Sequence, residues 1–499
     1  MAHENEAMNE DAVRWLVWDD KSVYALRRSK TAANLKAVSL KLAEIEPLRE
    51  ADARFQANYE TLCGFPGPVL QRLFEDPYSY YWTRVAFELT RTWAQGGQPD
   101  SLAAVYCSET ALNVQDALMR HLDDFARLLV GAALLAGKEL ELPVPLEVSA
   151  PFTVPGSVFS FNEPGSLQIY GCDGEFVTCG GANGVAEPAV PGRSPGPGGA
   201  TVDVCPHIVS DGHDILLQPA MLAVPLEKVP KDACSAPMKL QWSQKPSIES
   251  ALQLVGRLVP EIHAQLFTAL RAIIVYDSGD GEPYNGSHCD LPGLMIVNRV
   301  RRLEDYGIIL IHEFYHSRLF ALEEKALFFE QPVHMGQTMH YSPWRNEPRP
   351  MHGVLHAVYV HLPVARFLSK LLEATDEEEI RMVTRSRLVK ANEQLKLGIE
   401  QLAGCNFTSS GKMLFHQLER DVAELNKIVT GMGLSPDERS LTFERLSGKV
   451  VQHRDPVTGR VQSVRESLES HLSRVGSREE QRRLVGKLRY SEANSALTL

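Results

Sequence analysis

A short run of the sequence, ILIHEFYHSRLF at residues 309–320, contains two histidines four positions apart and a glutamate directly after the first. Residues at positions i and i+4 lie one turn apart on the same side of a helix, so His312 and His316 are placed to offer two imidazole nitrogens to one metal ion. Apolar residues surround the motif, and imidazoles without partners would be costly there. The spacing therefore predicts a metal-binding pair.

A third protein ligand has to come from outside this motif. Seven of the sixteen histidines fall between residues 312 and 361. His356 is the preferred ligand because it lies deep in an apolar stretch, and a ligating imidazole needs a fixed orientation. It also stands four residues after His352, in a segment that follows Pro350, the expected first-turn proline of a helix. The alternatives left open are His334, His340, His352, His361, Glu323, Glu324 and Glu330.

Two kinds of metal chemistry fit the motif, and its spacing does not separate them. In a zinc metallopeptidase, Glu313 would be the general base that takes a proton from zinc-bound water. In a non-haem iron oxygenase, three protein ligands occupy one face of the metal and leave positions open for O2 and a cosubstrate. A third possibility is a scaffold without catalysis that only binds a peptide.

The elements that would position the motif combine long helices with short strands. The segment LPGLMIVN at 291–298 is typical of a strand, and a helix is expected from residue 303 or 304 to about Phe329. A second helix is expected at 351–375, and residues 247–275 are expected to form a long helix that runs into a strand. The predicted fold class is α+β, mostly helical, with a zincin-like metal-binding helix beside a small β-sheet.

Composition and periodicity divide the chain into five expected regions. Apolar spacing of three and four residues indicates helices near both ends, whereas short runs rich in Val, Phe and Pro indicate strands between them. The regions are a helical region at 1–142, a short-strand region at 143–246 with a Gly/Pro-rich loop at 180–200, a catalytic core at 247–375, helices at 376–436 and a basic polar tail at 437–499. The tail, with 12 Lys/Arg against 9 Asp/Glu, is expected to be a mobile or peripheral helical extension.

Charge and composition exclude several classes of partner. A formal charge of -12 gives no general basic field for a nucleic-acid backbone. The longest apolar stretch, at 128–137, is too short to cross a bilayer and is expected to be a buried helix. The first residues lack the layout of a signal peptide, and the eight cysteines contain no CxxC pair. We therefore expect reduced thiols, a cytoplasmic location and neither nucleic acid nor membrane as partner; the oligomeric state stays open.

Three segments together resemble a known family. SHCDLPGLMIVN, ILIHEFYHSRL and PWRNEPRPMHGVLHAVYVHLPVARF are similar to the HExxH-motif peptide-modification proteins that accompany ribosomally made peptides. Members of that family are understood as Fe(II)- and 2-oxoglutarate-dependent peptide β-hydroxylases. The resemblance covers roughly residues 30–430, and neither the Gly/Pro-rich insertion at 180–200 nor the basic tail has a place in it.

The resemblance implies a set of roles. Iron would be held by His312, His316 and His356, with 2-oxoglutarate and O2 as cosubstrates, and zinc remains the alternative metal. Arg345 or Arg349 would bind the distal carboxylate of 2-oxoglutarate, because a guanidinium matches a carboxylate with two parallel hydrogen bonds.

The resemblance also changes the expected role of Glu313 and suggests the substrate. Glu313 would orient a ligand or a water molecule instead of acting as a base. The implied substrate is a precursor peptide hydroxylated at a β-carbon. It would add edgewise to an exposed strand beside the metal helix, lined by Ser287 and His288.

Overall fold

The structure, a computed structural model, forms two compact units. Unit 1 comprises Val255–Ile262 and Arg318–Leu499, together with Met1–Asp19, and unit 2 comprises Asp20–Leu254 and His263–Ser317. The residues that the structure describes are 20–44, 49–99, 101–138, 146–148, 152–157, 159–161, 165–172, 177–180, 186–189, 202–210, 213–218, 236–279, 283–330, 342–344, 349–433, 453–454 and 461–462.

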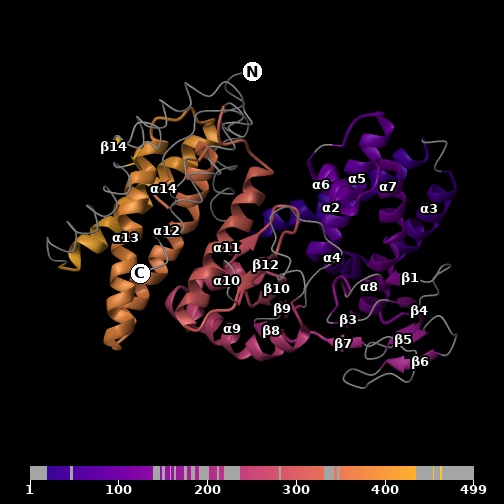
Figure 1. Ribbon diagram of the computed structural model, residues 1–499, viewed down its shortest axis with the longest axis horizontal. Coiled ribbons are helices and arrows are strands. Elements are labelled where there is room, and N and C mark those ends of the chain that lie inside the picture. Colours follow the sequence, from indigo (N-terminus) through magenta and orange to yellow (C-terminus); the bar gives the residue numbers. More distant parts are fainter. Residues whose placement is uncertain are drawn as a thin grey trace. The chain divides into compact units, whose positions relative to one another are not determined.

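Unit 2 begins with the helical array that the periodicity predicts (Figure 1). Local signals set its helix ends: Asp76 caps α5 by accepting a hydrogen bond from the Tyr78 backbone N–H, and Gly137 ends α8 in the left-handed conformation. The apolar stretch at 128–137 lies in α8 and is largely buried, as expected. The helices are α2 (Asp20–Leu42), α3 (Arg49–Cys63), α4 (Gly67–Glu75), α5 (Pro77–Ala94), α6 (Ser101–Thr110), α7 (Val114–Asp123) and α8 (Ala126–Ala136).

A five-stranded mixed sheet forms the centre of unit 2. Its order is β11-β12-β10-β9-β8, in which β10 pairs in parallel with β9 and β12, while β8 and β11 pair antiparallel at the two edges. The segment predicted as a strand at 291–298 forms β12. The strands are β8 (His207–Ser210), β9 (His213–Leu217), β10 (Ala272–Tyr276), β11 (Gly286–Ser287) and β12 (Leu294–Asn298).

The sheet is covered on both faces because side chains alternate along its strands. Ala272, Ile274 and Tyr276 of β10 share a core with the helical array. Ile273 and Val275 share another core with α9 (Met238–Leu258), α10 (Pro260–Ala269) and α11 (Leu303–Glu323). The motif helix α11 therefore lies beside a small sheet, and the fold class is confirmed as mostly helical α+β.

Two expected boundaries near the motif are corrected. The helix expected within 247–275 is broken between α9 and α10, because Pro260 cannot continue the backbone hydrogen-bond ladder and instead opens the next helix. The motif helix α11 ends at Glu323 and not near Phe329. Phe329 forms an antiparallel bridge with Phe407, so tertiary pairing replaces the last expected turns.

Two low-complexity segments contain strands that composition did not predict. The Gly/Pro-rich segment at 180–200, expected as a loop, includes β6 (Ala186–Ala189), which pairs with β5 (Val177–Gly180) at the edge of a four-stranded sheet. Proline is tolerated at a sheet edge, which explains Pro188 there. In the tail, expected to be helical, the described residues form β13 (His453–Arg454) and β14 (Val461–Gln462).

The short strands between the array and the central sheet form two further small sheets. β1 (Leu146–Val148) and β4 (Gly165–Cys172) complete the four-stranded sheet, and a three-stranded sheet has the order β2-β3-β7. Its strands are β2 (Phe152–Thr153), β3 (Phe159–Phe161) and β7 (Val202–Val204). Short strands are therefore present in the region where the sequence predicts them.

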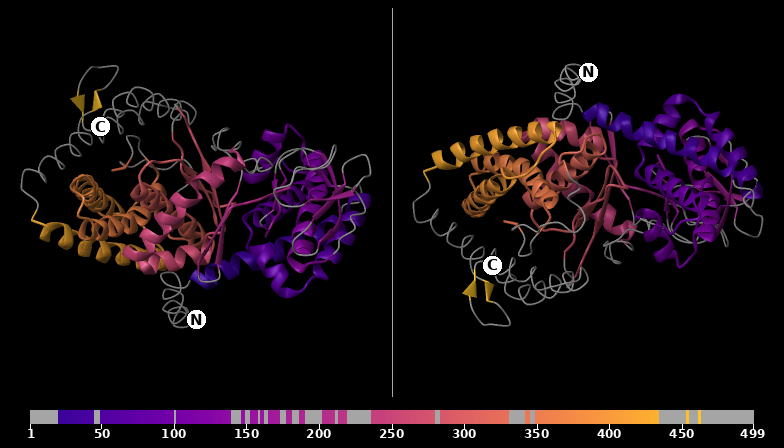
Figure 2. Two further views of the ribbon diagram at one scale, coloured as in Figure 1. Left: turned by 90° about the horizontal axis from the view of Figure 1, so that it is seen from below. Right: turned by 90° about the horizontal axis from the view of Figure 1, so that it is seen from above.

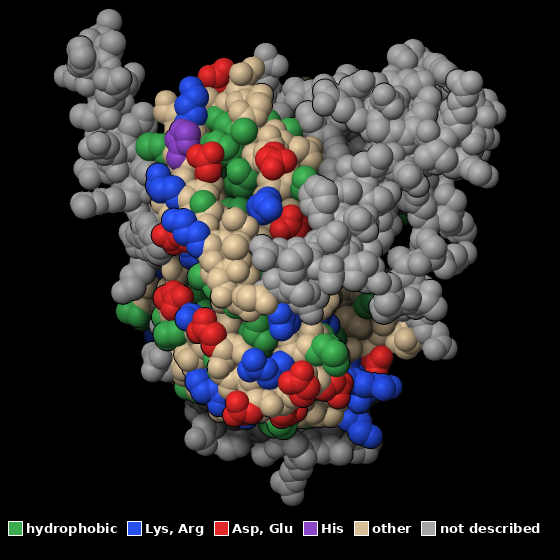
Figure 3. All heavy atoms as spheres, turned by 90° about the vertical axis from the view of Figure 1, so that its left-hand side faces the viewer, with side chains coloured by type: hydrophobic (Ala, Val, Ile, Leu, Met, Phe, Trp, Pro, Cys, Tyr) green, Lys and Arg blue, Asp and Glu red, His purple; other side chains and the backbone are tan. Residues whose placement is uncertain are grey.

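Unit 1 contains three long helices that pack side by side (Figures 1 and 2). They are α12 (Met351–Ala374), α13 (Glu378–Leu402) and α14 (Ser409–Gly431), which agree with the helices predicted at 351–375 and within 376–436. Gly398 permits close packing of α13, because a Cβ at this position would lie 2.6 Å from Val358 Cγ2 on α12. On the face drawn in Figure 3, basic and acidic side chains are interspersed among the described residues. No described helix has the length and apolarity to cross a membrane.

Candidate metal centres

The motif helix α11 is fixed in unit 2 by one apolar row. Tyr306, Leu310 and Phe314 follow each other at intervals of four residues and are almost fully buried in the core beneath the sheet. His312 and His316 lie on a different row of the same helix and are only partly buried. The core therefore sets the rotation of α11 and leaves the histidine row partly accessible.

The two motif histidines lie together, as their spacing predicts. Their ring centroids are 4.8 Å apart, and the ring planes make an angle of 77°. Neutral imidazoles one turn apart are a donor set suited to zinc or iron, with metal–nitrogen distances of about 2.0–2.1 Å. This juxtaposition of partly accessible imidazoles fits a metal ion held by His312 and His316.

The glutamate of the motif is held by the edge of the sheet. Glu313 is 5% exposed, and its Oε2 accepts a hydrogen bond of 3.1 Å from the Ser287 hydroxyl. Ser287 belongs to β11, the edge strand next to β12. The strand that was expected to line a peptide substrate is therefore bonded directly to the metal motif.

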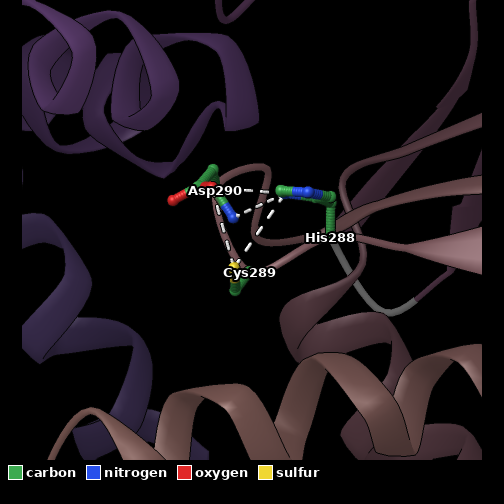
Figure 4. A group of neighbouring side chains, drawn as sticks. All are labelled: His288, Cys289 and Asp290. Atoms are coloured by element: carbon green, nitrogen blue, oxygen red, sulfur yellow. Dashed lines mark hydrogen bonds and ion pairs between the residues drawn. The ribbon is translucent and has the colours of Figure 1, made fainter. Parts of the chain in front are cut away.

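The turn after β11 carries a second group of polar side chains, His288, Cys289 and Asp290 (Figure 4). The His288 ring nitrogen Nδ1 accepts the Asp290 backbone N–H at 3.2 Å, and the Cys289 thiol lies 3.7 Å from Asp290 Oδ2. Asp290 Oδ1 lies 2.6 Å from a guanidinium nitrogen of Arg84 on α5, and this carboxylate raises the Arg84 pKa against the opposing effect of burial. The group thus ties the turn to the helical array and fixes the strand that carries Ser287.

A third group, in unit 1, unites one carboxylate with two imidazoles. Glu323 Oε1 lies 2.5 Å from His352 Nε2 and 3.1 Å from His356 Nε2. Its three ligand atoms all lie within 4.8 Å of one another. His352 and His356 are one turn apart on α12, with ring centroids separated by 4.3 Å, and Phe320 packs 5.2 Å from the His356 ring. This is a two-histidine, one-carboxylate set.

The electrostatics of this third group favour a charged carboxylate. Burial by itself raises the pKa of Glu323, but hydrogen bonds from His352 and His356 and their electrostatic effect outweigh burial, so the pKa falls to about 2. The cluster therefore places one ionised carboxylate oxygen beside two imidazole nitrogens.

The remaining sequence-predicted residues have different positions. His356, expected as the third ligand of the motif metal, lies with Glu323 and His352 in unit 1, and its role at His312 and His316 stays a prediction. Arg349 lies against the first turn of α12, where its Cδ is 3.3 Å from the position of a Cβ on Gly353. His361 packs edge-on against Trp344 at 5.2 Å. Arg345, His334 and His340 lie outside the described residues.

Sequence reasoning missed two partnerships, that of Ser287 with Glu313 and that of Glu323 with both α12 histidines. One signal pointed to the second. Glu323 stands in the last turn of α11, where the helix dipole disfavours an anion, and no basic residue shares that turn. A carboxylate in that position is expected to be stabilised by partners from another element.

The chain matches no sequence profile of a known protein family, and no curated protein is significantly similar to it.

Proposed function

We propose that this protein is an Fe(II)- and 2-oxoglutarate-dependent oxygenase that hydroxylates a β-carbon in a ribosomally made precursor peptide. One observation carries the proposal: the paired imidazoles of His312 and His316 flank a glutamate that is hydrogen-bonded to the edge strand of the sheet. The resemblance of the three segments to peptide β-hydroxylases supports the same chemistry. Both histidines, Glu313 and Ser287 belong to unit 2.

The proposed reaction balances without a further reductant. O2 oxidises 2-oxoglutarate to succinate and CO2, and its second oxygen atom is inserted into a C–H bond of the peptide. When bound, Fe(II) supplies the site at which O2 is activated. His312 and His316 would supply two of the three protein ligands that such a metal site uses.

Glu313 has a positioning role in this proposal. One of its carboxylate oxygens accepts the Ser287 hydroxyl, and the side chain is buried. A buried carboxylate that is engaged by the substrate-facing strand is well placed to fix the relative positions of strand and metal helix. The proposal therefore does not require Glu313 to abstract a proton.

The edge strand offers a docking place for the peptide. β11 pairs with β12 on one side only, so among the described strands its other side is the free edge of the sheet. An extended peptide adds to such an edge through backbone hydrogen bonds. A peptide residue bound beside Ser287 would therefore lie close to the strand that is hydrogen-bonded to Glu313 of the motif.

The test measures the cosubstrate and the peptide separately. The full chain is loaded with Fe(II) without oxygen, and then O2, 2-oxoglutarate and the precursor peptides encoded beside its gene are added. We expect succinate, and a peptide that gains one oxygen atom, with both products lost in His312→Ala and His316→Ala. The matched control is His263→Ala on α10, a helical histidine of the same unit whose ring packs 4.7 Å from that of Phe267.

Two results would contradict the proposal. A peptide cleaved without 2-oxoglutarate would replace the oxygenase with the zinc peptidase, in which Glu313 is the base. Succinate formation that survives His312→Ala but disappears in Glu323→Ala would move the iron to the carboxylate group of unit 1.

A further inference from the structure

A second cluster in unit 1 is not used by the proposed reaction. It consists of Glu323 at the end of α11 and of His352 and His356 in the first two turns of α12. Both imidazole Nε2 atoms converge on the same carboxylate oxygen, Oε1. We propose that Glu323, His352 and His356 form a separate binding site for a divalent first-row transition metal ion.

The donor set selects the class of ion. Two imidazole nitrogens and one carboxylate oxygen suit zinc or iron, whereas magnesium and calcium prefer sites made of oxygen ligands. A structural zinc site usually has four protein ligands, so a three-ligand site keeps a position open for water or another small ligand. The side chains of Glu323 and His352 are each 23% exposed, and that of His356 is 8% exposed. The site is thus partly enclosed and remains reachable.

The distances are close to those of a metal site. Ligand atoms at about 2.0–2.1 Å from a tetrahedral ion are about 3.3 Å apart. The separation of 3.1 Å between His356 Nε2 and Glu323 Oε1 nearly equals this value. The separation of 2.5 Å between His352 Nε2 and Glu323 Oε1 is shorter. A shift of the two atoms by less than about 1 Å, through side-chain rotation, would bring it to the separation expected around a metal ion.

The packing around the cluster fixes the histidine that lies deepest. The Phe320 ring contacts the His356 ring at 5.2 Å, and the two histidine rings contact each other at 4.3 Å. Such support keeps an imidazole in a single orientation, which a metal ligand requires. The i, i+4 spacing on α12 also repeats the spacing of the motif pair on α11.

The proposal assigns His356 to this site and away from the motif metal. It does not depend on the proposed oxygenase activity, because the ligands can be tested by metal content alone. The experiment uses the full chain, stripped of metal with a chelator and then dialysed against Zn²⁺. Zinc per chain is measured for the wild type and for the His312→Ala/His316→Ala variant, in which the proposed site is intact.

We expect the His312→Ala/His316→Ala variant to retain one equivalent of zinc. Adding Glu323→Gln and His352→Gln to it should remove that equivalent. The matched control adds His416→Ala instead. His416 pairs with Glu419 at 3.4 Å on one helix, both side chains are more than half exposed, and the pair contains no second histidine. This control should keep one equivalent.

The two proposals fail in different ways. If the His312→Ala/His316→Ala variant binds no zinc, the second site does not exist, whatever the activity of the wild type. X-ray absorption of the zinc in this variant supplies a readout that needs no substitution within the cluster. A shell with two imidazoles and one carboxylate supports the site, and a shell without imidazole overturns it. Absence of succinate in the wild type, with zinc retained as expected, would end only the oxygenase proposal.

Discussion

The two histidine pairs of this protein share a spacing and differ in their carboxylate. On α11, Glu313 follows the first histidine in the same helix, and its carboxylate accepts a hydrogen bond from Ser287 of the sheet edge. On α12, the carboxylate comes from another helix, and Glu323 accepts both imidazoles on one oxygen. A residue directly after a histidine is rotated by about 100° around the helix, whereas a residue from a neighbouring helix can face the pair.

The difference teaches that spacing alone specifies a pair of donors and not a complete ligand set. The third donor depends on how elements cross. At the α12 pair, a neighbouring helix contributes the carboxylate of Glu323. At the α11 pair, the carboxylate of Glu313 instead accepts a hydrogen bond from strand β11. Three substitutions test this contrast and an acid titration tests a histidine outside both pairs, from the largest expected effect to the smallest.

Gly411→Ala should damage the α12 pair and spare the α11 pair. A Cβ at Gly411 would overlap the Phe328 backbone carbonyl, just beyond the end of α11. We expect the free energy of unfolding of unit 1 to fall by about 3 kcal/mol, since the clash involves backbone that cannot rotate away. Denaturant unfolding and zinc content measure both effects. Gly431→Ala, on the same helix, is the control, because a Cβ there would meet no described atom within 4 Å beyond its own stretch of helix. Equal zinc loss from both pairs would contradict the contrast.

Acid should destabilise the protein through a histidine that belongs to neither pair. His121 is buried, stacks on Trp82 at 4.9 Å and donates to the Trp82 carbonyl at 2.8 Å. Burial lowers its pKa from 6.5 to about 4, against the hydrogen bond to the Trp82 carbonyl.

The unfolded chain then binds more protons than the folded chain between pH 6.5 and about 4. The contribution of His121 to the free energy of unfolding should therefore fall as the pH falls through this window, by about 3 kcal/mol, and change no further below it. Denaturant unfolding at several pH values measures the slope. His121→Gln should flatten it, and a slope that remains in this variant but vanishes in His352→Gln would assign the titration to the α12 pair.

Ser287→Ala should lower catalysis without removing the motif metal. The hydroxyl positions Glu313 and is not itself a ligand, so we expect succinate formation to drop about tenfold, the lower end for partners of metal-site residues. Zinc content should not change. Ser243→Ala is the control, because its hydroxyl donates to the Leu240 carbonyl and accepts from the Gln244 amide on α9, outside the motif. An unchanged rate of succinate formation in Ser287→Ala would show that strand β11 has no role in catalysis.

His416→Ala should have the smallest effect. His416 and Glu419 repeat the histidine–glutamate chemistry of the α12 cluster on an exposed surface. An exposed ion pair contributes little, so the free energy of unfolding should change by less than about 0.5 kcal/mol in thermal or denaturant unfolding. A loss of unfolding free energy as large as that in Glu323→Gln would mean that burial does not distinguish the His416–Glu419 pair from the α12 cluster.

The sequence predicted those features that depend on local periodicity. The length and position of α12, the strand β12, the burial of α8 and the juxtaposition of His312 and His316 all follow from residue spacing. Each of them needs only neighbours within one element. The i, i+4 relation of His352 and His356 was visible in the same way.

Features that depend on distant partners were not predictable from spacing. Helix α11 ends at Glu323, earlier than predicted, because Phe329 pairs with Phe407, which lies 78 residues later in the sequence. The partnership of Glu323 with His352 is another contact between elements, and so is that of Ser287 with Glu313. Composition also failed for β6, because an edge strand tolerates proline.

The shortness of β11 sets a limit on affinity. A strand of two residues has one outward-facing backbone N–H and C=O pair, so a docked peptide gains about two hydrogen bonds there. At about 1 kcal/mol each, they contribute roughly 2 kcal/mol, whereas micromolar binding needs about 8 kcal/mol. Most of the recognition of any peptide substrate must therefore come from contacts beyond this strand. Truncated peptides that keep only the residues around the modified position should consequently be weak competitors of the whole precursor.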